Sequence, residues 1–279
     1  MIDELRRVVT PEGDAGDVSP SVVKQCCAAL YESDAARLLL GESFHPGGAR
    51  LTERLGQILN LTPQTRVLDV AAGKGASAVL LAARFGCEVV GIDYSGKNVE
   101  EAARNANEMG LGERVSFQQG DAERLPFADG SFDVVICECA FCTFPNKQAA
   151  ANEFARELRK GGRVGLSDLT RNGALAPELD GLLSRIACIA DAQPLATCAA
   201  LLSGAGLEVG VTEEHDSALI ELVNQMRLRL LAADVMVGLK KLALPGFDFE
   251  AARKVAKHAL QAIKEGNLGY AIVTASKAT

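Results

Sequence analysis

The sequence predicts an α/β protein with seven strands, on three observations. Short apolar segments alternate with segments of helical periodicity, as in a parallel sheet that helices cover on both faces. Of the 279 residues, 48% are hydrophobic and 23% are charged, which provides enough apolar material for a sizeable core. The first apolar segment ends in a turn with two glycines before a helix begins, as is typical of nucleotide-binding sheets.

The N-terminal elements are expected in a regular order. Residues 1–17 are polar and predict a loose arm. Apolar residues then recur at helical spacing over 18–40, and Ser19-Pro20 fits the start of a helix. A second helix follows over 49–59. Beyond it, the predicted strands are 66–70, 88–93, 115–117, 132–137 and 163–167, and the predicted helices between them are 76–85, 95–109 and 147–158.

The C-terminal third is expected to be mostly helical, with two further strands. The predicted helices are 177–190, 195–205, 218–239 and 249–264, and the predicted strands are 207–211 and 269–274. The last two helices have an amphipathic pattern and precede the final strand. They therefore form an insertion, over about 217–264, before the chain returns to the sheet.

The charge balance and the cysteines restrict the function classes. Lys and Arg number 29 against 36 Asp and Glu, and a net charge of −7 argues against sequence-independent binding of nucleic acid. No segment has the apolar length of a membrane span, and the first residues lack the apolar core of a signal peptide. We therefore expect a cytoplasmic protein that acts on neither nucleic acid nor a membrane, in which the 8 cysteines form no structural disulfides.

The glycine turn carries the first chemical information. Gly73 and Gly75 allow a ligand to approach the backbone, and Asp93 at the end of the next strand can accept hydrogen bonds from ribose hydroxyls. The alternative is a tight turn with an ordinary strand-end Asp. A dinucleotide site is disfavoured, because Ala71 replaces its first glycine and Asp69 would repel a pyrophosphate. The carboxylate of Asp69 suits a cationic ligand instead.

At this point the sequence resembles the class I S-adenosylmethionine-dependent methyltransferases, of the methyltransferase type 11 domain. Five segments carry the resemblance between about residues 50 and 170: 67–75, 91–93, 120–127, 131–135 and 158–163. The resemblance implies a Rossmann-like, seven-stranded mixed sheet whose last strands form an antiparallel edge. It also implies an N-terminal arm and helical lid over residues 1–48, followed by a methyltransferase domain over 49–279.

The resemblance further implies the residues that bind S-adenosylmethionine, and it implies no metal. Asp69 and the backbone of Ala71, Gly73 and Gly75 are expected at the methionine part, and Asp93 with Tyr94 at the ribose end. Asp121 and Ala122 are expected at the adenine, and Glu138 beside the transferred methyl group, next to Cys139. Ala71 departs from the usual glycine, and we expect it to have a negative φ, which alanine tolerates.

Three cysteines, Cys137, Cys139 and Cys142, lie where the fourth strand leaves the sheet. Ligands bind at the carboxyl ends of strands in open α/β sheets, so at least one of these thiols is expected at the substrate cavity. Cys137 and Cys139 share a face if the strand continues, and Cys142 returns towards them after a turn. The alternative is that these thiols are small core residues. The spacing and the scarcity of histidine disfavour zinc.

A finer resemblance is to the arsenite methyltransferases. Its residues are Cys26-Cys27, Cys139 with Pro145-Asn146-Lys147, Ser167-Asp168, and Cys188 on the predicted helix 177–190. It implies that Cys188 binds trivalent arsenic with Cys26 or Cys27 as its partner, that Cys139 and Cys188 are catalytic, and that Cys142 contributes to the substrate site. The chain departs from that branch over residues 31–48, and it has no cysteine after Cys198.

Two rival functions stay open. His45 is expected as a lid residue or general base, unless it merely caps the following helix. With His45 or Glu138 as base, the acceptor is an ordinary carbon, oxygen or nitrogen atom of a small molecule. His215 after the sixth strand can face the same cavity. The other rival is a non-catalytic protein that binds the cofactor or a metalloid, because fold alone does not establish catalysis.

Overall fold

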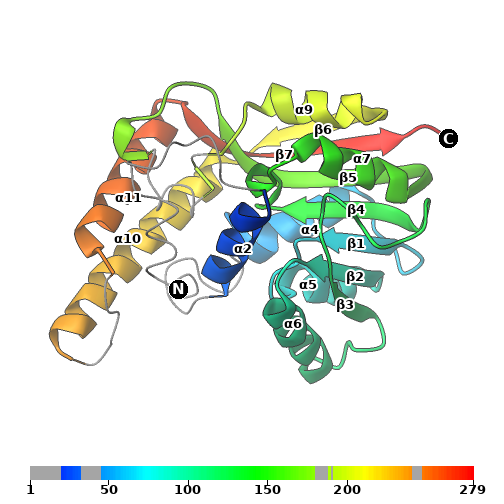
Figure 1. Cartoon of the computed structure of the whole chain (residues 1–279), viewed down its shortest axis with the longest axis horizontal. Coiled ribbons are helices and arrows are strands. Elements are labelled where there is room, and N and C mark those ends of the chain that lie inside the picture. The colour runs from blue at the N-terminus through cyan, green and yellow to red at the C-terminus, as the bar shows by residue number, and fades with distance from the viewer. Residues whose placement is uncertain (1–19, 33–44, 180–187, 190, 241–246) are drawn as a thin grey trace.

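The computed structural model describes the chain except residues 1–19, 33–44, 180–187, 190 and 241–246. Seven strands form one sheet (Figure 1). They are β1 (Arg66–Val70), β2 (Glu88–Asp93), β3 (Val115–Gln119), β4 (Phe132–Glu138), β5 (Leu158–Arg171), β6 (Leu207–Glu214) and β7 (Leu268–Lys277). The spatial order is β3-β2-β1-β4-β5-β7-β6. β7 is antiparallel to β5 and β6, and the other neighbours are parallel, so the predicted mixed sheet is confirmed.

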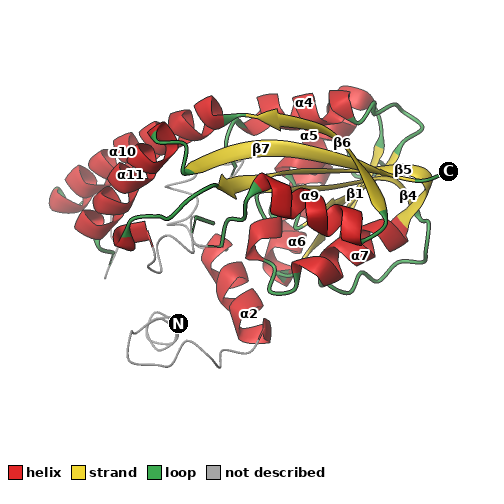
Figure 2. Ribbon diagram, turned by 90° about the horizontal axis from the view of Figure 1, so that it is seen from above, coloured by secondary structure: helices red, strands yellow, loops and turns green. Residues whose placement is uncertain are grey.

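Helices cover both faces of this sheet. The described helices of the chain are α2 (Pro20–Tyr31), α4 (Gly48–Ile58), α5 (Ala76–Phe85), α6 (Gly96–Glu108), α7 (Lys147–Glu157), α9 (Leu195–Gly204), α10 (Asp216–Gly238) and α11 (Phe249–Lys264), with short 3₁₀ helices η1 (Phe141–Thr143) and η2 (Pro177–Leu179). Figure 2 shows α4 and α5 on one side of the sheet and α7 and α9 on the other. None of the helices that the structure describes is both long enough and apolar enough to cross a membrane.

Alternation along each central strand builds the two core layers. In β1, Val67 belongs to the apolar cluster that includes Leu55 of α4 and Leu81 of α5. Its neighbour Leu68 belongs to the cluster that includes Phe154 of α7. Successive side chains point to opposite faces of a strand, so an apolar strand with both faces covered is buried throughout, as predicted for a parallel sheet.

The sheet has a topological switch point between β1 and β4. The chain moves outward from β1 through β2 to β3, then returns to the other side of β1 with β4 and continues to β5. Connections on the two sides therefore diverge at the carboxyl ends of β1 and β4, which is where open α/β sheets bind ligands.

The predicted C-terminal helices are confirmed between β6 and β7, where α10 and α11 start and end within two residues of the expected bounds. Figure 1 shows the pair projecting together beyond one end of the sheet. β5 is longer than predicted, because β7 pairs with it from Arg163 to Arg171. The predicted helix 18–40 is shorter in its described part, where α2 ends at Tyr31.

The predicted helix 177–190 is wrong at both described ends. Only Pro177–Leu179 form a short 3₁₀ helix, and Cys188 lies in a turn with a φ of 61°. Such a left-handed backbone cannot continue an α-helix of L-residues. Cys188 and Ile189 are instead buried in an apolar cluster with residues of other elements.

Candidate active site

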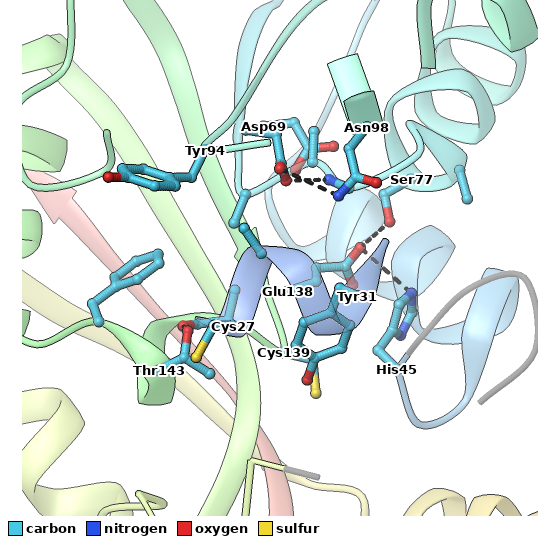
Figure 3. Close-up of a pocket in the computed structure, with 18 of the residues that line it drawn as sticks. Cys27, Tyr31, His45, Asp69, Ser77, Tyr94, Asn98, Glu138, Cys139 and Thr143 are labelled. Carbon is cyan, nitrogen blue, oxygen red and sulfur yellow. Dashed lines mark hydrogen bonds and ion pairs between the residues drawn. The ribbon is translucent and has the colours of Figure 1, made fainter. Parts of the chain in front are cut away.

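A pocket lies at the carboxyl ends of β1, β2 and β4, with one face of α2 against it (Figure 3). The pocket combines small backbone-exposing residues, carboxylates and one cysteine of the β4 end. Its lining residues are Lys24, Cys27, Ala28, Tyr31, His45, Asp69, Ala71, Ala72, Gly73, Ala76, Ser77, Asp93, Tyr94, Asn98, Glu138, Cys139, Ala140, Thr143 and Phe144.

The glycine loop between β1 and α5 is shaped by two left-handed glycines. Gly75 has a φ of +80°, and a Cβ there would lie 2.5 Å from the ring of Phe117, so packing excludes any larger residue. Gly73 has a φ of +55°, and a Cβ there would meet nothing within 4 Å. Gly73 therefore faces open space, which leaves its backbone accessible to a ligand in the pocket.

Ala71 has a φ of +60°, so the expected negative φ is wrong. The turn out of β1 requires the left-handed conformation that glycine usually supplies, and here an alanine adopts it. A left-handed L-residue costs roughly 1–2 kcal/mol. Ala71 therefore lines the pocket, as predicted, on a strained backbone.

Asp93 fixes the glycine loop to the end of β2. Its carboxylate accepts hydrogen bonds from the backbone N–H groups of Gly73 at 2.8 Å and Ser95 at 2.9 Å, and from the amide of Asn98 at 3.3 Å. Burial raises the pKa of Asp93 despite these bonds. Asp93 and its neighbour Tyr94 both line the pocket, where the sequence predicts the ribose.

Asp69 and Glu138 make the floor of the pocket acidic. Asp69 is only 2% exposed, and burial, followed by the charges of Glu138 and Asp93, raises its pKa well above the usual range. Within the part of the chain that the structure describes, its Oδ2 has no hydrogen-bond partner. A buried, unpaired carboxylate oxygen in this setting is the group that a bound cation would satisfy.

Glu138 lies at the centre of a hydroxyl network. Its carboxylate accepts hydrogen bonds from Thr52 at 2.9 Å, Ser77 at 2.6 Å and Ser167 at 3.2 Å. Tyr270 donates to Ser167 in turn, at 3.0 Å between the oxygens. These donors come from four different elements, so the carboxylate is held in one orientation.

His45 joins the same network from the turn before α4. Its Nε2 lies 3.3 Å from the hydroxyl of Thr52 and 3.9 Å from Glu138 Oε2, and its ring lines the pocket (Figure 3). The capping alternative is wrong, because Gly47 is the N-cap of α4. His215 contacts Glu213 at 3.3 Å instead of joining the described lining of the pocket.

The predicted adenine residues lie beside α2. Both carboxylate oxygens of Asp121 contact Lys24 Nζ, at 2.9 and 2.7 Å, and Glu123 contacts the same ammonium at 2.7 Å. Ala122 packs at the edge of the apolar cluster that contains Leu68 and Phe154. Lys24 lines the pocket, whereas Asp121 and Ala122 are not among its described lining residues.

Three cysteines converge beside the pocket: Cys139, Cys142 and Cys188, here called the thiol cluster. The Cys188 sulfur lies 3.7 Å from the backbone carbonyl oxygen of Cys139, and Cys142, Cys188 and the partly buried Cys139 belong to one apolar cluster. The same sulfur also lies 3.0 Å from the hydroxyl of Tyr31. Cys139 and Cys188 have left-handed backbones, with φ of 52° and 61°. Strained non-glycine residues persist only where the surroundings enforce them, and they concentrate at functional sites.

Within the thiol cluster, the pKa of Cys188 and the pKa values of the other two thiols are shifted in opposite directions. Hydrogen bonds from the other two thiols of the cluster, and then from Tyr31, lower the pKa of Cys188 well below its usual range. The same bonds, together with burial, raise the pKa of Cys139 and of Cys142. Asp168 closes the cluster by accepting from the backbone N–H of Cys142 at 2.8 Å, and burial, then the charge of Cys188, raises its pKa to about 7.

Cys137 does not share a face with Cys139. β4 ends at Glu138, and the left-handed turn at Cys139 breaks the alternation that the prediction assumed. Cys137 is buried in the core cluster on the α7 side. Cys27 lines the pocket, whereas the side chain of Cys26 lies outside the described residues. The pairing of Cys188 with Cys26 or Cys27 stays a prediction.

A sequence profile described as a methyltransferase domain matches residues 61–204, just over half of the chain. This range runs from the residues before β1 to the end of α9 and contains the glycine loop, Glu138 and the thiol cluster. The chain belongs to the class I S-adenosylmethionine-dependent methyltransferases.

Curated relatives of this methyltransferase include two bacterial proteins that are also named as methyltransferases. Methyltransferase GfsG of Streptomyces halstedii is 33% identical over 58% of this chain. The 27-O-demethylrifamycin SV methyltransferase of Amycolatopsis mediterranei is 35% identical over 49% of it. The chain spans 59% and 54% of the lengths of these two relatives.

Solved structures share the fold of the methyltransferase. A phosphoethanolamine N-methyltransferase of Haemonchus contortus, in complex with S-adenosyl-L-methionine, has a TM-score of 0.78 at 20% identity. The alignment covers 96% of this chain and 62% of that one. The carboxylates of this pocket suit such a cofactor. S-adenosylmethionine carries positive ammonium and sulfonium groups, and the unpaired oxygen of Asp69 lies in an acidic part of the pocket that can bind them.

Sequence analysis missed several residues of the methyltransferase pocket. Lys24, Tyr31 and Ser77 all line it, and Thr52 and Ser77 hold Glu138. Lys24, Cys27, Ala28 and Tyr31 are spaced three, four and seven residues apart, so they share one face of a helix. That spacing predicts that these four residues lie together, but the sequence does not show that α2 packs against the pocket.

Proposed function

We propose that this methyltransferase transfers a methyl group from S-adenosylmethionine to a small acceptor held by thiolates, with a thiol-bound trivalent arsenical as the leading candidate. One observation carries the proposal: three cysteines from two separate segments, the turn after β4 and the turn at Cys188, converge beside the cofactor pocket, and Cys139 belongs to both the cluster and the pocket. Thiols buried as independent core residues have no reason to share hydrogen bonds or to adopt strained backbone.

Residues of the pocket bind the cofactor in this proposal. Asp69 and Glu138 compensate its positive charges, and the backbone at Ala71, Gly73 and Gly75 lies along its methionine part. Asp93 with Tyr94 binds the ribose, and Asp121 with Ala122 binds the adenine. When bound, the cofactor supplies an electrophilic methyl group on a sulfonium.

The thiol cluster suits a soft acceptor. Trivalent arsenic prefers thiolate ligands, and three of them in a trigonal arrangement leave its lone pair free. Cys188 is the thiol that is ionised most readily, so it is the first ligand, and Cys139 and Cys142 complete the set after losing their protons. Cys142 and Cys188 are buried and Cys139 is half-buried at the pocket, so the acceptor is sheltered from water and catalysis consists mostly of positioning.

A second candidate is methylation of a carbon, oxygen or nitrogen atom of an organic acceptor. The network of His45, Thr52 and Glu138 favours it, since Thr52 lies within hydrogen-bond reach of both other residues. Either His45 or Glu138 can then take a proton from the acceptor. One relative, the 27-O-demethylrifamycin SV methyltransferase, is named for such an organic substrate.

The deciding experiment incubates the purified chain with S-adenosylmethionine, arsenite and glutathione, and detects methylated arsenic by chromatography with mass detection. Methylated product that is lost in Cys188→Ser but kept in Cys87→Ala supports the thiol site, because Cys87 is buried in a different core cluster. If the chain binds S-adenosylhomocysteine tightly and forms no arsenical product, the arsenical proposal is wrong. Organic acceptors are then tested with His45→Gln, and a chain that methylates none of them is a binding protein.

A further inference from the structure

Helix α2 lies across two regions of the site. One is the cofactor half, which consists of the glycine loop, Asp69, Asp93 and the loops after β2 and β3, and the other is the thiol cluster. Lys24, Cys27, Ala28 and Tyr31 form the face of α2 that lines the pocket. Figure 3 shows Cys27 and Tyr31 reaching into the pocket from this helix. The two ends of the face contact different partners, so α2 connects two regions of the site.

The first end of this face is tied to the cofactor half. Lys24 Nζ lies 2.7 Å from both Asp121 Oδ2 and Glu123 Oε2, and its side chain is only 14% exposed. Charge-assisted hydrogen bonds of this kind are about twice as strong as neutral ones. Just past the other end of α2, Glu32 accepts a hydrogen bond from Ser95 at 2.5 Å. Ion pair and hydrogen bond together dock α2 on the loops after β2 and β3.

The far end of the face contacts the thiol cluster. The hydroxyl of Tyr31 lies 3.0 Å from the Cys188 sulfur, across 157 positions of the chain. The ring of Tyr31 packs against the apolar cluster that contains Cys142 and Cys188. Cys188 is 1% exposed and has a left-handed backbone, so contacts with other segments, such as the one with Tyr31, hold its sulfur in place.

We propose that Tyr31 is a positioning residue for the acceptor thiols. Its hydroxyl donates to Cys188 and holds that sulfur in the cluster, and Lys24 keeps α2 docked so that Tyr31 reaches it. The thiols are then fully arranged only while α2 is docked on the cofactor half. The inference rests on the proposed function, because positioning matters only for an acceptor bound at the thiol cluster.

The first test measures how fast Cys188 is alkylated by iodoacetamide in the cofactor-free chain, by peptide mass spectrometry. A buried thiol reacts when its cover opens, so the rate reports the opening of α2. Tyr31→Phe keeps the ring and removes one hydrogen bond, and we expect alkylation about five- to tenfold faster. Lys24→Met acts from the other end of the helix, and we expect an increase of about tenfold or more.

Two controls separate this effect from general loosening of the fold. Cys87 and Cys198 are buried in the two other core clusters, and their alkylation rates in the same samples should stay as in the wild type. Lys257→Met removes an exposed ammonium from α11, and it should leave the rate at Cys188 unchanged. If Tyr31→Phe and Lys24→Met leave Cys188 at the wild-type rate, the proposal is overturned.

The second test separates positioning from a purely structural role. We expect Tyr31→Phe to raise the KM for arsenite about tenfold, to change kcat much less, and to leave the affinity for S-adenosylhomocysteine unchanged in calorimetry. Equal losses of both affinities contradict positioning. If the wild type methylates no arsenical but the alkylation rates respond as expected, the proposed function fails while the link between Tyr31 and Cys188 stands.

Discussion

The cofactor half and the thiol cluster of this methyltransferase are assembled differently. The glycine loop, Asp69 and Asp93 come from two adjacent parallel strands and the turns after them, and hydrogen bonds such as Gly73 to Asp93 span only 20 positions. The thiol cluster joins residues that are 49 positions apart, and Tyr31 contacts it across 157. Local assembly makes a site readable from sequence motifs, whereas distant assembly leaves only scattered residues in the sequence.

Both halves nevertheless share one device. Ala71, Cys139 and Cys188 all have positive φ without being glycine. Each of them lies at a point where a strand or buried segment turns into the site. The strained backbone at these three residues sets the direction in which the chain enters the site, and an unstrained backbone would not hold that direction.

The largest effect should come from removing the first thiol ligand. We expect Cys188→Ser to lower arsenite turnover about 100-fold or more, equivalent to about 2.7 kcal/mol of transition-state stabilisation, because a hydroxyl is not a soft ligand. The affinity for S-adenosylhomocysteine should stay as it is if the two halves are separable at this residue. Calorimetry and turnover on the same preparation check both parts, and a matching loss of cofactor affinity would break the comparison.

Asp69→Asn should affect the other half. The change removes the charge that faces the cation while keeping the shape, and we expect binding of S-adenosylmethionine to weaken by about 1.5–3 kcal/mol. The same substitution removes a buried carboxylate beside Glu138 and Asp93, so the free energy of unfolding should rise by about 0.5–2 kcal/mol without ligand. Calorimetry and urea unfolding measure the two effects. A variant that binds normally would show that Asp69 serves the fold alone.

Asp168→Asn should reveal a dependence of stability on pH that belongs to the thiol cluster. Burial raises the pKa of Asp168 to about 7. Between the ordinary carboxyl pKa and that value, the folded chain keeps a proton that the unfolded chain has lost. The free energy of unfolding therefore falls by at most about 1.4 kcal/mol per unit as pH rises towards 7, and it levels off above.

Urea unfolding at pH 5, 6, 7 and 8 checks this prediction about Asp168. The advantage of the wild type over Asp168→Asn should shrink as the pH rises, because only the wild type has this carboxyl group. A difference between the two proteins that does not depend on pH would contradict the burial of an ionisable group there.

The smallest effect is expected at Ala71. Ala71→Gly removes the steric cost of a left-handed alanine, and the greater freedom of glycine in the unfolded chain offsets part of it. We expect a net gain of about 0.5–1 kcal/mol in the free energy of unfolding. Thermal unfolding measures the change. Destabilisation would mean that the methyl group of Ala71 packs usefully within the loop.

The comparison also explains what the sequence could predict. The alternation of strands and helices predicted the sheet correctly, and the motifs around Asp69 and Asp93 predicted that both line one pocket, because these features depend on short-range patterns. Cys188 was assigned to a helix because its neighbours are apolar, whereas distant packing holds it in a turn. The prediction that Cys139 shares a face with Cys137 was wrong for a related reason. No sequence pattern indicates that β4 ends at Glu138 and that Cys139 has a left-handed backbone.

The place of β7 has a consequence for how the chain is made. β6 joins the sheet only through β7, which separates it from β5. Residues 207–214 therefore have no strand to pair with until residues 268–277 have been synthesised, and α10 and α11 are made in between. On the ribosome, this edge of the sheet is necessarily assembled late, and until then β5 exposes an unpaired border that a chaperone or a neighbouring nascent chain can contact.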